Sequence, residues 1–247
     1  MRTFGLIGYP LTHSFSQKYF SKKFEDEGID ARYLNFPLSN IGELKGLLEQ
    51  HPYLAGLNVT IPYKEQVLPF LDELDTEAGH IGAVNVIKIT WNQGKAHLKG
   101  YNSDLKGFSE SLTPLLKDHH RKALILGTGG ASKAVAHGLL KAGILYRFVS
   151  RSPKSPAQVS YEALSPEILS EYKVIVNTSP LGMSPNTDQC PHLPYEALGA
   201  DHLCYDLIYN PETTLFLQKA AEQGAVIKNG LDMLHLQAEA AWRIWNS

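Results

Sequence analysis

The sequence predicts an α/β protein whose chain forms open, mostly parallel sheets. Short apolar runs alternate with stretches of helical periodicity along its whole length, which is the pattern of strands separated by helices. A length of 247 residues allows one large domain or two of ordinary size. Because a second block of alternating elements begins after Ser103, we expect two domains, residues 1–103 with 231–247 and residues 104–230.

The first block is bounded by a short apolar strand and a hairpin. Gly28 ends the first predicted helix, and Asn40 and Glu43 have the spacing of a capping box at the start of the second. The turn at 92–94 (Asn-Gln-Gly) joins the last two strands. The predicted strands cover residues 4–8, 31–36, 54–59, 84–90 and 96–101, and the predicted helices 14–27, 40–50, 64–71 and 75–80.

The second block repeats the alternation of strand and helix. Pro211 is expected at the start of a helix, where its missing N–H leaves no hydrogen bond unmade. Proline- and serine-rich stretches at 152–156 and 179–194 are predicted loops. The predicted strands cover residues 123–126, 146–150, 174–177, 203–206 and 226–228, and the predicted helices 105–116, 131–142, 211–223 and 232–245.

The composition argues against several classes of protein. Hydrophobic residues make up 43% of the chain and charged residues 19%, so packed cores are expected rather than disorder. A formal net charge of −2 gives no reason to expect nucleic acid or an anionic membrane as partner. Cys190 and Cys204 form no CxxC pair, which suits a reducing cytoplasm. Asp188, Cys190 and His192 alternate in a loop but match no standard zinc spacing, so we expect no metal.

A glycine-rich turn opens the second block, between an apolar strand and a helix, which is the context that a dinucleotide-binding turn requires. Gly127 permits the tight turn, and Gly129 and Gly130 let backbone N–H groups approach a pyrophosphate. The helix that begins at Ala131 directs its positive dipole end to the same place. An ordinary strand–helix turn is the alternative, but the flanking elements favour a Rossmann-type domain.

The end of the next strand indicates which dinucleotide is bound. NAD sites of this type place an acid roughly 20 residues after the turn, on the ribose hydroxyl. This chain has Ser150, Arg151 and Lys154 there, and no acid. The planar guanidinium of Arg151 suits a 2′-phosphate. A solvated basic loop is the alternative, but the missing acid favours NADP, and with it a hydride-transferring oxidoreductase.

Polar residues near strand ends of the first block are candidates for the chemistry. Lys64 follows a turn after the strand at 54–59, and Asp104 precedes a helix. Hydride removal from an alcohol carbon needs a base for the hydroxyl proton, which a lysine or a lysine–aspartate pair can supply. The ordinary alternative for Lys64 is a surface lysine, and the ordinary alternative for Asp104 is a helix N-cap. Asn85 lies in an apolar strand, where a buried amide needs backbone or ligand partners.

The order of short motifs along nearly the whole chain resembles the shikimate dehydrogenase family. Six or more motifs in this order are far more specific than any one of them. They are GYP at 8–10, HSFS at 13–16, NVTIPYK at 58–64, IGAVN at 81–85, NSD at 102–104, the glycine turn at 127–132, NTSPLGM at 177–183, DLIY at 206–209, and NGLDM with QA at 229–238.

The resemblance implies an enzyme that reversibly reduces 3-dehydroshikimate to shikimate with NADPH in aromatic amino-acid biosynthesis. It implies a substrate domain followed by an NADP-binding domain, with Lys64 and Asp104 as the catalytic pair. Hydroxyl and amide side chains suit a polyhydroxylated ring with a carboxylate. The implied substrate contacts are Ser14, Ser16, Asn58, Thr60, Asn85, Tyr209 and Gln237, and further cofactor contacts are Thr178, Leu207 and Gly230.

Two other functions stay open at this point. A quinate/shikimate dehydrogenase that prefers NAD should carry an acid near Ser150, and a non-catalytic dinucleotide-binding sensor should lack the pair of Lys64 and Asp104. Tyr209 could instead pack at a strand end, and Ser16 could cap the first helix. We expect a cytoplasmic monomer or homodimer that binds small molecules, with neither nucleic acid nor a membrane as partner.

Overall fold

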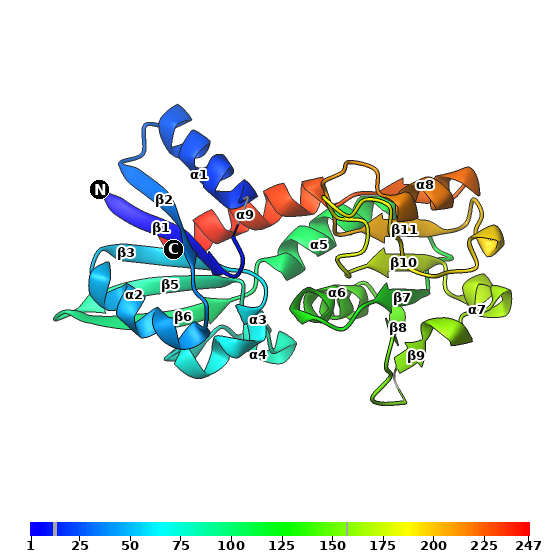
Figure 1. The fold of residues 1–247 in the computed structure, drawn as a ribbon, viewed down its shortest axis with the longest axis horizontal. Helices are drawn as coiled ribbons and strands as arrows, with labels where there is room; N and C mark the ends of the chain where they lie inside the picture. The colour runs from blue at the N-terminus through cyan, green and yellow to red at the C-terminus, as the bar shows by residue number, and fades with distance from the viewer. Residues whose placement is uncertain (12–13, 157) are drawn as a thin grey trace. The chain divides into compact units, whose positions relative to one another are not determined.

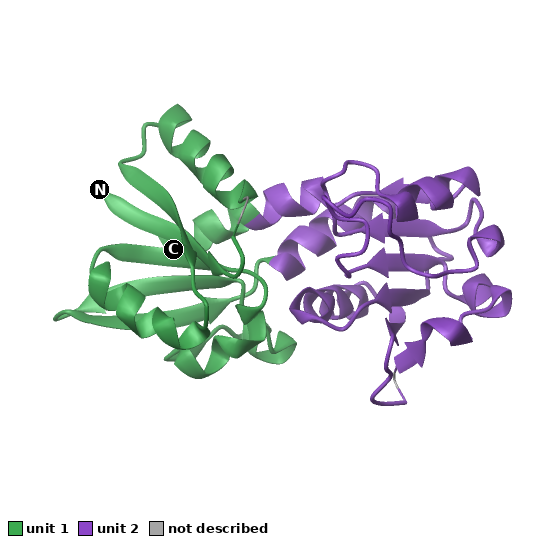
Figure 2. Ribbon diagram, viewed as in Figure 1, with its two compact units in different colours: residues 1–103, 238–247 green, residues 104–237 purple. Residues whose placement is uncertain are grey.

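The computed structural model describes residues 1–11, 14–156 and 158–247, so His13 of the HSFS motif lies outside the described residues. Over the described part of the chain the strands form two six-stranded sheets, and helices alternate with the strands along the chain (Figure 1). The chain divides into two compact units, Met1–Ser103 with Ala238–Ser247, and Asp104–Gln237 (Figure 2). The α/β fold predicted from the alternating pattern is confirmed.

The first unit is built on a mixed sheet with the order β2-β1-β3-β5-β6-β4. β1 pairs in parallel with β2 and β3, whereas β5 runs antiparallel to β3 and β6. The hairpin turn between β5 and β6 has positive φ at Gln93 and Gly94, as a tight turn requires. The elements are β1 (Arg2–Gly8), α1 (Phe15–Asp26), β2 (Ala31–Pro37), α2 (Leu44–Gln50), β3 (Leu54–Val59), α3 (Tyr63–Gln66), β4 (Glu73–Leu74), α4 (Thr76–Ile81), β5 (Val86–Asn92) and β6 (Lys95–Tyr101).

Each face of this sheet has its own apolar core. Leu44 and Leu47 of α2 pack with inward residues of β1, β3 and β5 on one face. Phe20 of α1 and Trp245 of the C-terminal helix pack against Phe4 on the other, and Figure 1 shows α1 and α2 on opposite sides of the strands. Burial on both faces explains why the central strands β1 and β3 have few polar residues.

The second unit is built on a parallel sheet with the order β12-β11-β10-β7-β8-β9. Counted from β7, this is the order 3-2-1-4-5-6 of the dinucleotide-binding Rossmann fold, which confirms that prediction. The elements are α5 (Asp104–Leu112), β7 (Lys122–Leu126), α6 (Gly130–Lys141), β8 (Leu145–Ser150), β9 (Gln158–Ser160), α7 (Pro166–Glu171), β10 (Val174–Asn177), β11 (Leu203–Asp206), α8 (Leu215–Glu222), β12 (Val226–Lys228) and α9 (Leu231–Asn246).

Helices cover both faces of this sheet as well. α5, α6 and the start of α9 pack on one face through residues such as Phe108, Val135 and Met233. α7 and α8 pack on the other through Leu169 and Phe216. Figure 2 shows α9 passing from one unit to the other, because its first residues belong to the second core and its last to the first. Residues 231–237, which we assigned with the first domain, therefore belong to the second unit.

All ten predicted strands are present, and the differences concern short elements and helix starts. β4, β9 and α7 were not predicted. The helix predicted from Pro211 begins instead at Leu215, because Thr214 caps it by accepting from the Leu217 N–H. The expected capping box at Asn40 is wrong, since Glu43 accepts from the Ser39 N–H and α2 is preceded by a 3-10 turn.

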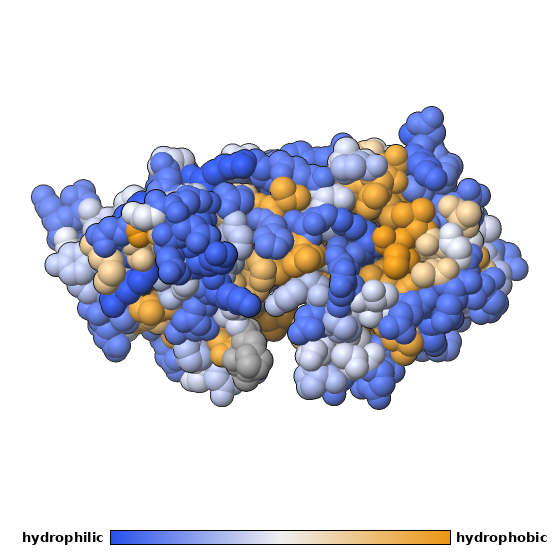
Figure 3. Space-filling view, turned by 90° about the horizontal axis from the view of Figure 1, so that it is seen from above, coloured by the Kyte–Doolittle hydropathy of each residue, from blue (hydrophilic) through white to orange (hydrophobic). Residues whose placement is uncertain are grey.

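The surface in Figure 3 is mostly hydrophilic, with smaller groups of hydrophobic residues between the polar ones. Exposed large hydrophobic side chains are spread over both units, for example Tyr53, Ile61 and Leu145. Single exposed apolar residues of this kind are ordinary on a folded protein. Within the described part of the chain, no helix is both long enough and apolar enough to cross a membrane.

Candidate active site

The predicted polar residues of the first unit lie at one edge of its sheet. β1 and β3 are parallel and end at the same edge, and antiparallel β5 begins there. The Thr60 N–H donates to the Ile7 carbonyl (2.9 Å) and the Val59 N–H to the Asn85 carbonyl (2.9 Å). Asn58, Thr60 and Asn85 are thereby brought together at the carboxyl ends of β1 and β3, where open α/β sheets bind their ligands.

Asn85 is fixed at this edge by Ser103. Asn85 is 3% exposed, its amide nitrogen donates to the Ser103 hydroxyl (3.0 Å), and its amide oxygen accepts from the Ser103 N–H (2.7 Å). Asn58 donates to the Asn85 carbonyl (3.3 Å). The buried amide thus has the partners that a buried polar group requires, and it holds the segment that leads to Asp104.

Tyr33 on β2 is a member of this site that the sequence did not indicate. Its hydroxyl donates to the Asn58 amide oxygen (2.7 Å) and is hydrogen-bonded to the Ser16 side chain. The ring is 3% exposed and stacks on Phe20, with ring centroids 4.9 Å apart. Burial raises the pKa of Tyr33 well above its usual value, so the hydroxyl keeps its proton. Because Tyr33 occupies the amide oxygen, Asn58 is oriented to present its amide nitrogen.

The backbone around Lys64 is held on both sides. The Tyr63 side chain is buried and its hydroxyl donates to the Leu38 carbonyl (2.6 Å). The Lys64 carbonyl accepts from the Val84 N–H (2.7 Å), next to Asn85, and its side chain is half-buried at the start of α3. Lys64 therefore stands at the same edge of the sheet as Asn58 and Asn85. Ser14, and not Ser16, caps α1 by accepting from the Gln17 N–H (3.1 Å).

In the second unit, α5 begins at Asp104 and lies against the part of α9 that contains Gln237. Asp104 is 2% exposed in the first turn of α5, and Gly107 lies one turn later on the same helix face. A side-chain carbon at Gly107 would stand 2.6 Å from the Met233 carbonyl oxygen and 3.2 Å from Cβ of Gln237. Only a glycine permits this close crossing of α5 and α9. Tyr209, which is 38% exposed, lies in the loop after β11.

The glycine-rich turn after β7 has the geometry of a phosphate cradle. Gly127 has φ of +115°, a conformation that strongly favours glycine. Gly129 precedes α6 with no side-chain cap, and a side-chain carbon there would meet nothing within 4 Å. Backbone N–H groups at an uncapped, twelve-residue helix suit a phosphate group. The helix begins at Gly130, one residue earlier than predicted at Ala131.

The remaining cofactor candidates lie at the carboxyl ends of the neighbouring strands. Because β7 pairs with both β8 and β10, the ends of β7 and β10 flank the point at which the strand order reverses. Thr178 follows β10, and its hydroxyl donates to the Leu126 carbonyl beside the glycine turn (2.9 Å). Leu207 follows β11, and the Gly230 backbone approaches its carbonyl group closely. The structure thus places Gly127, Thr178, Leu207 and Gly230 along one edge.

The segment after β8 has the cationic character expected of a 2′-phosphate site. β8 ends at Ser150, whose hydroxyl accepts from the Ser152 N–H (3.2 Å). Arg151 is exposed, and its positive charge lowers the pKa of Tyr161 against a larger rise caused by burial. The Lys154 N–H donates to the Gln158 side chain (2.9 Å). Residues 150–156 contain no acid.

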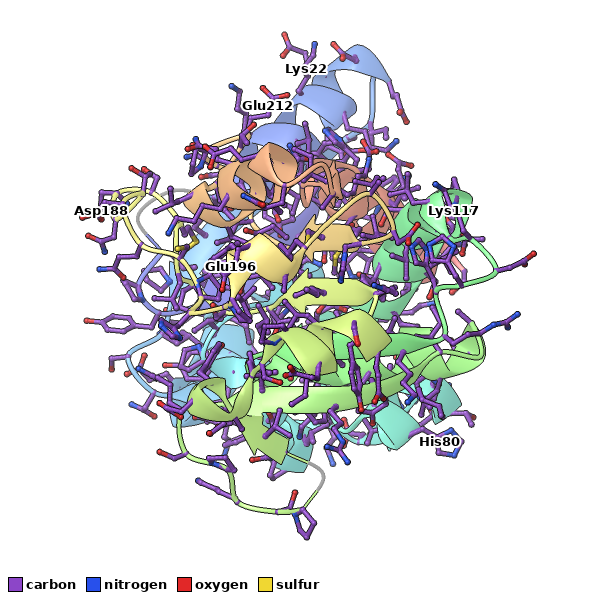
Figure 4. The ribbon with its side chains drawn as sticks, turned by 90° about the vertical axis from the view of Figure 1, so that its right-hand side faces the viewer. Lys22, His80, Lys117, Asp188, Glu196 and Glu212 are labelled. Atoms are coloured by element: carbon purple, nitrogen blue, oxygen red, sulfur yellow. The ribbon has the colours of Figure 1, made fainter. Side chains whose placement is uncertain are left out.

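A surface cavity of about 490 Å³ lies elsewhere in the second unit, between the loop at 190–196 and α8. Cys190, His192 and Lys219 are among its lining residues, and none of the predicted site residues in the described chain lines it. Figure 4 shows Asp188 at the outer edge of its loop. Among the described residues, no group of three or more histidine, cysteine or acidic side chains could hold a metal ion. This cavity has no part in the site described above.

The two units together indicate a class of protein, the dinucleotide-dependent oxidoreductases. One is an open α/β unit with a polar edge, and the other is a Rossmann-type unit with a phosphate cradle. Residues 6–87 match the family model described as the shikimate dehydrogenase substrate binding domain.

Proteins named shikimate dehydrogenase (NADP(+)) match nearly all of the chain. One from Methanococcus maripaludis is 39% identical and one from Carboxydothermus hydrogenoformans 37%, in each case over 98% of this chain and 90% of the relative. The crystal structure of shikimate 5-dehydrogenase from Thermus thermophilus in complex with NADP(H) and shikimate aligns with a TM-score of 0.85 at 31% identity, over 99% of this chain and 93% of the other. The chain belongs to the shikimate dehydrogenase family.

A quinate dehydrogenase from Corynebacterium glutamicum, solved in complex with NAD, has the same fold. It aligns with a TM-score of 0.85 at 27% identity, over 99% of this chain. The fold therefore does not by itself distinguish the two substrates or the two dinucleotides, and the side chains at the polar edge and after β8 must do so.

Proposed function

We propose that this chain catalyses the reversible reduction of 3-dehydroshikimate to shikimate, with NADPH as the hydride donor. The observation that carries the proposal is the polar edge of the first unit, where Asn58, Asn85 and Lys64 stand side by side at the ends of buried strands. Such a set binds a small ring with several hydroxyl groups rather than an apolar substrate. Full-length relatives named shikimate dehydrogenase support it.

In the proposed site each group has one task. Ser14, Ser16, Thr60, Tyr209 and Gln237 bind hydroxyl or carboxylate oxygens of the substrate, and Asn58 donates from the amide nitrogen that Tyr33 orients. Bound NADPH supplies the hydride to the carbonyl carbon. Lys64 and Asp104 give the carbonyl oxygen its proton, or accept the hydroxyl proton in the reverse direction. Either group of the pair is chemically able to carry that proton.

The proposed cofactor site spans the carboxyl edge of the second sheet. The turn residues Gly127, Gly129, Gly130 and Ala131 present backbone N–H groups to the pyrophosphate. Further along the edge, Ser150, Arg151 and Lys154 bind the 2′-phosphate, and Thr178, Leu207 and Gly230 line the nicotinamide end. We also propose that the protein is cytoplasmic and that it is a monomer or homodimer; sedimentation of the purified protein tests the oligomeric state.

The function is tested by measuring turnover of shikimate and quinate with NADP and with NAD. We expect the combination of shikimate and NADP to give the highest kcat/KM. Faster turnover of quinate with NAD would instead identify a quinate/shikimate dehydrogenase. NADPH binding without any turnover would identify a dinucleotide-binding sensor. Either result would overturn the proposal.

Replacing Arg151 with alanine is expected to raise KM for NADP roughly 10- to 100-fold, because it removes hydrogen bonds from a charged donor. KM for NAD, which has no 2′-phosphate, should stay unchanged. Arg147→Ala, at an exposed arginine of the preceding strand β8, is the matched control. Equal losses with both dinucleotides would remove Arg151 from the 2′-phosphate site.

Tyr33→Phe is expected to raise KM for shikimate roughly three- to tenfold while kcat and KM for NADP change little. The substitution keeps the buried ring but leaves the Asn58 amide oxygen without its donor, so the amide can rotate. Steady-state kinetics at saturating NADP measure the effect. Tyr53→Phe, at a tyrosine that is 78% exposed, should change nothing. An unaltered KM in Tyr33→Phe would mean that Asn58 keeps its orientation without the tyrosine.

A further inference from the structure

A carboxylate with uncharged donors is buried at the end of β11. Asp206 is fully buried, and its oxygens accept from the Asn177 amide nitrogen (3.1 Å), the Ile208 N–H (3.0 Å) and the Thr214 hydroxyl (2.6 Å). Asn177 and Thr214 are fully buried as well. A buried carboxylate is unfavourable unless several donors satisfy it, and here three donors from three segments converge on one group.

The Asp206 network joins the loops that follow β10 and β11. Asn177 is the last residue of β10, and its amide oxygen accepts from the N–H (3.0 Å) and the hydroxyl (2.7 Å) of Ser179 in the next turn. Thr214 is the N-cap of α8. Asp206 therefore fixes the start of the loop after β10, both ends of the loop after β11, and the first turn of α8.

Three proposed cofactor residues are attached directly to this network. Thr178 follows Asn177 and contacts the glycine turn through the Leu126 carbonyl. Leu207 follows Asp206, and its N–H donates to the Asn177 carbonyl (3.0 Å). Gly230 packs on the Leu207 carbonyl, and its N–H donates to the Ile208 carbonyl (3.0 Å). A shift of Asp206 or Asn177 would move all three.

We propose that Asp206 is a positioning residue for the dinucleotide, and that its ionised carboxylate holds Thr178, Leu207 and Gly230 in the arrangement that receives the nicotinamide end. This inference rests on the proposed function. A carboxylate is the group suited to the place, because it accepts from all three donors without presenting a hydrogen of its own. An asparagine would turn an N–H group toward at least one donor.

The carboxylate is unfavourable for the stability of the fold. Burial raises the pKa of Asp206 to about 6, although Thr214, Ile208 and Asn177 lower it. Since the folded state binds the proton more tightly than the unfolded chain, the stability contributed by this group is present at low pH and is lost as the pH rises through about 6. Two titratable groups of the described chain lie around Asp206. Burial is the largest cause that raises the pKa of Tyr195, the charge of Asp206 is one of the smaller ones, and Cys204 lies two residues before Asp206 on β11. The hydrogen-bond partners Asn177 and Thr214 do not titrate.

The test is Asp206→Asn in the full chain, with two measurements. Titration of NADPH fluorescence without substrate should show binding at least about tenfold weaker, because Thr178, Leu207 and Gly230 are no longer held in the arrangement that receives the dinucleotide. The thermal midpoint at pH 7.5 should be unchanged or higher, because the variant no longer buries a charge. KM for shikimate should change little. A merely structural role predicts the reverse, a lower midpoint with unaltered NADPH binding, and would overturn the inference.

Two matched variants sharpen this test. Asp201→Asn replaces an exposed acid five residues earlier and should bind NADPH like the wild type. Thr214→Ser keeps the hydroxyl and should also keep affinity, whereas Thr214→Val removes it and should weaken NADPH binding in the same direction as Asp206→Asn. Wild-type protein that binds NADPH but does not turn over shikimate would refute the proposed function alone. Normal binding by both Asp206→Asn and Thr214→Val would refute this inference alone.

Discussion

Replacing Lys64 with methionine is expected to lower kcat by a factor of roughly 10² to 10⁴, the contribution of a positioned acid or base. KM for shikimate should change much less, because Asn58, Asn85 and the serines bind the ring. The fold should be unaffected. The Lys64 carbonyl, which accepts from the Val84 N–H, and the buried Tyr63 side chain hold this turn, and neither depends on the lysine ammonium.

The effect is measured by steady-state kinetics together with the thermal midpoint. Lys45→Met, at an exposed lysine of α2 in the same unit, is the control and should behave like the wild type. Full kcat in Lys64→Met would exclude the lysine from proton transfer. A joint fall in kcat and in the thermal midpoint would instead mean that the side chain supports the turn.

Combining Lys64→Met with Asp104→Asn tests whether the two groups act together. If they exchange one proton as a unit, the double variant should lose no more than the more damaging single variant, as residues of one catalytic group do. Losses that multiply would mean that Lys64 and Asp104 contribute to separate steps.

Most of the fold was predictable because its signals are local. Apolar runs identify strands wherever both faces of a sheet are covered, and each predicted strand is present. The glycine turn was interpretable for the same reason, since a strand, a positive-φ glycine and a helix start are adjacent in the chain. β4, with two residues, and β9, with three, are too short to show any period.

Helix starts were predicted less well, because competing signals occur side by side. Pro211 suits a first helical turn, but Thr214 three residues later has a hydroxyl that caps α8. At Asn40 the capping spacing was present, yet the Glu43 carboxylate bonds to the Ser39 N–H. In both places the residue at which the helix begins depends on the path of the chain before it, which local spacing does not reveal.

The candidate site was predictable as a set of residues but not as a set of contacts. Asn58 and Asn85 stand out as polar residues beside apolar ones. Their partner Tyr33 does not, because a tyrosine in a strand is most often core. Tyr33 bonds to a residue 25 positions away, and Asn177 bonds to Asp206 29 positions away. Spacing along the chain cannot show such pairs, although an acid at the end of an apolar strand is itself a signal.

Gly230→Ala is expected to impair the cofactor site and the stability of the fold together. A side-chain carbon at Gly230 would stand 2.1 Å from the Leu207 carbonyl oxygen and 2.5 Å from its carbonyl carbon. Backbone atoms cannot rotate away as a side chain can, so the loop after β11 or the start of α9 must move. Overpacking of this kind costs about 1–3 kcal/mol of the free energy of unfolding. Chemical denaturation measures that loss.

The functional effect of the same substitution follows from where the strain falls. Leu207 is bonded to Asn177 and adjoins Asp206, so a displaced Leu207 shifts the edge that also carries Thr178. We expect NADPH to bind at least about tenfold more weakly, with KM for shikimate less affected. Gly199→Ala, at a glycine of the same unit where a side-chain carbon meets nothing within 4 Å, is the control. Unchanged NADPH affinity in a destabilised Gly230→Ala variant would mean that the contact of Leu207 and Gly230 serves the fold and not the cofactor.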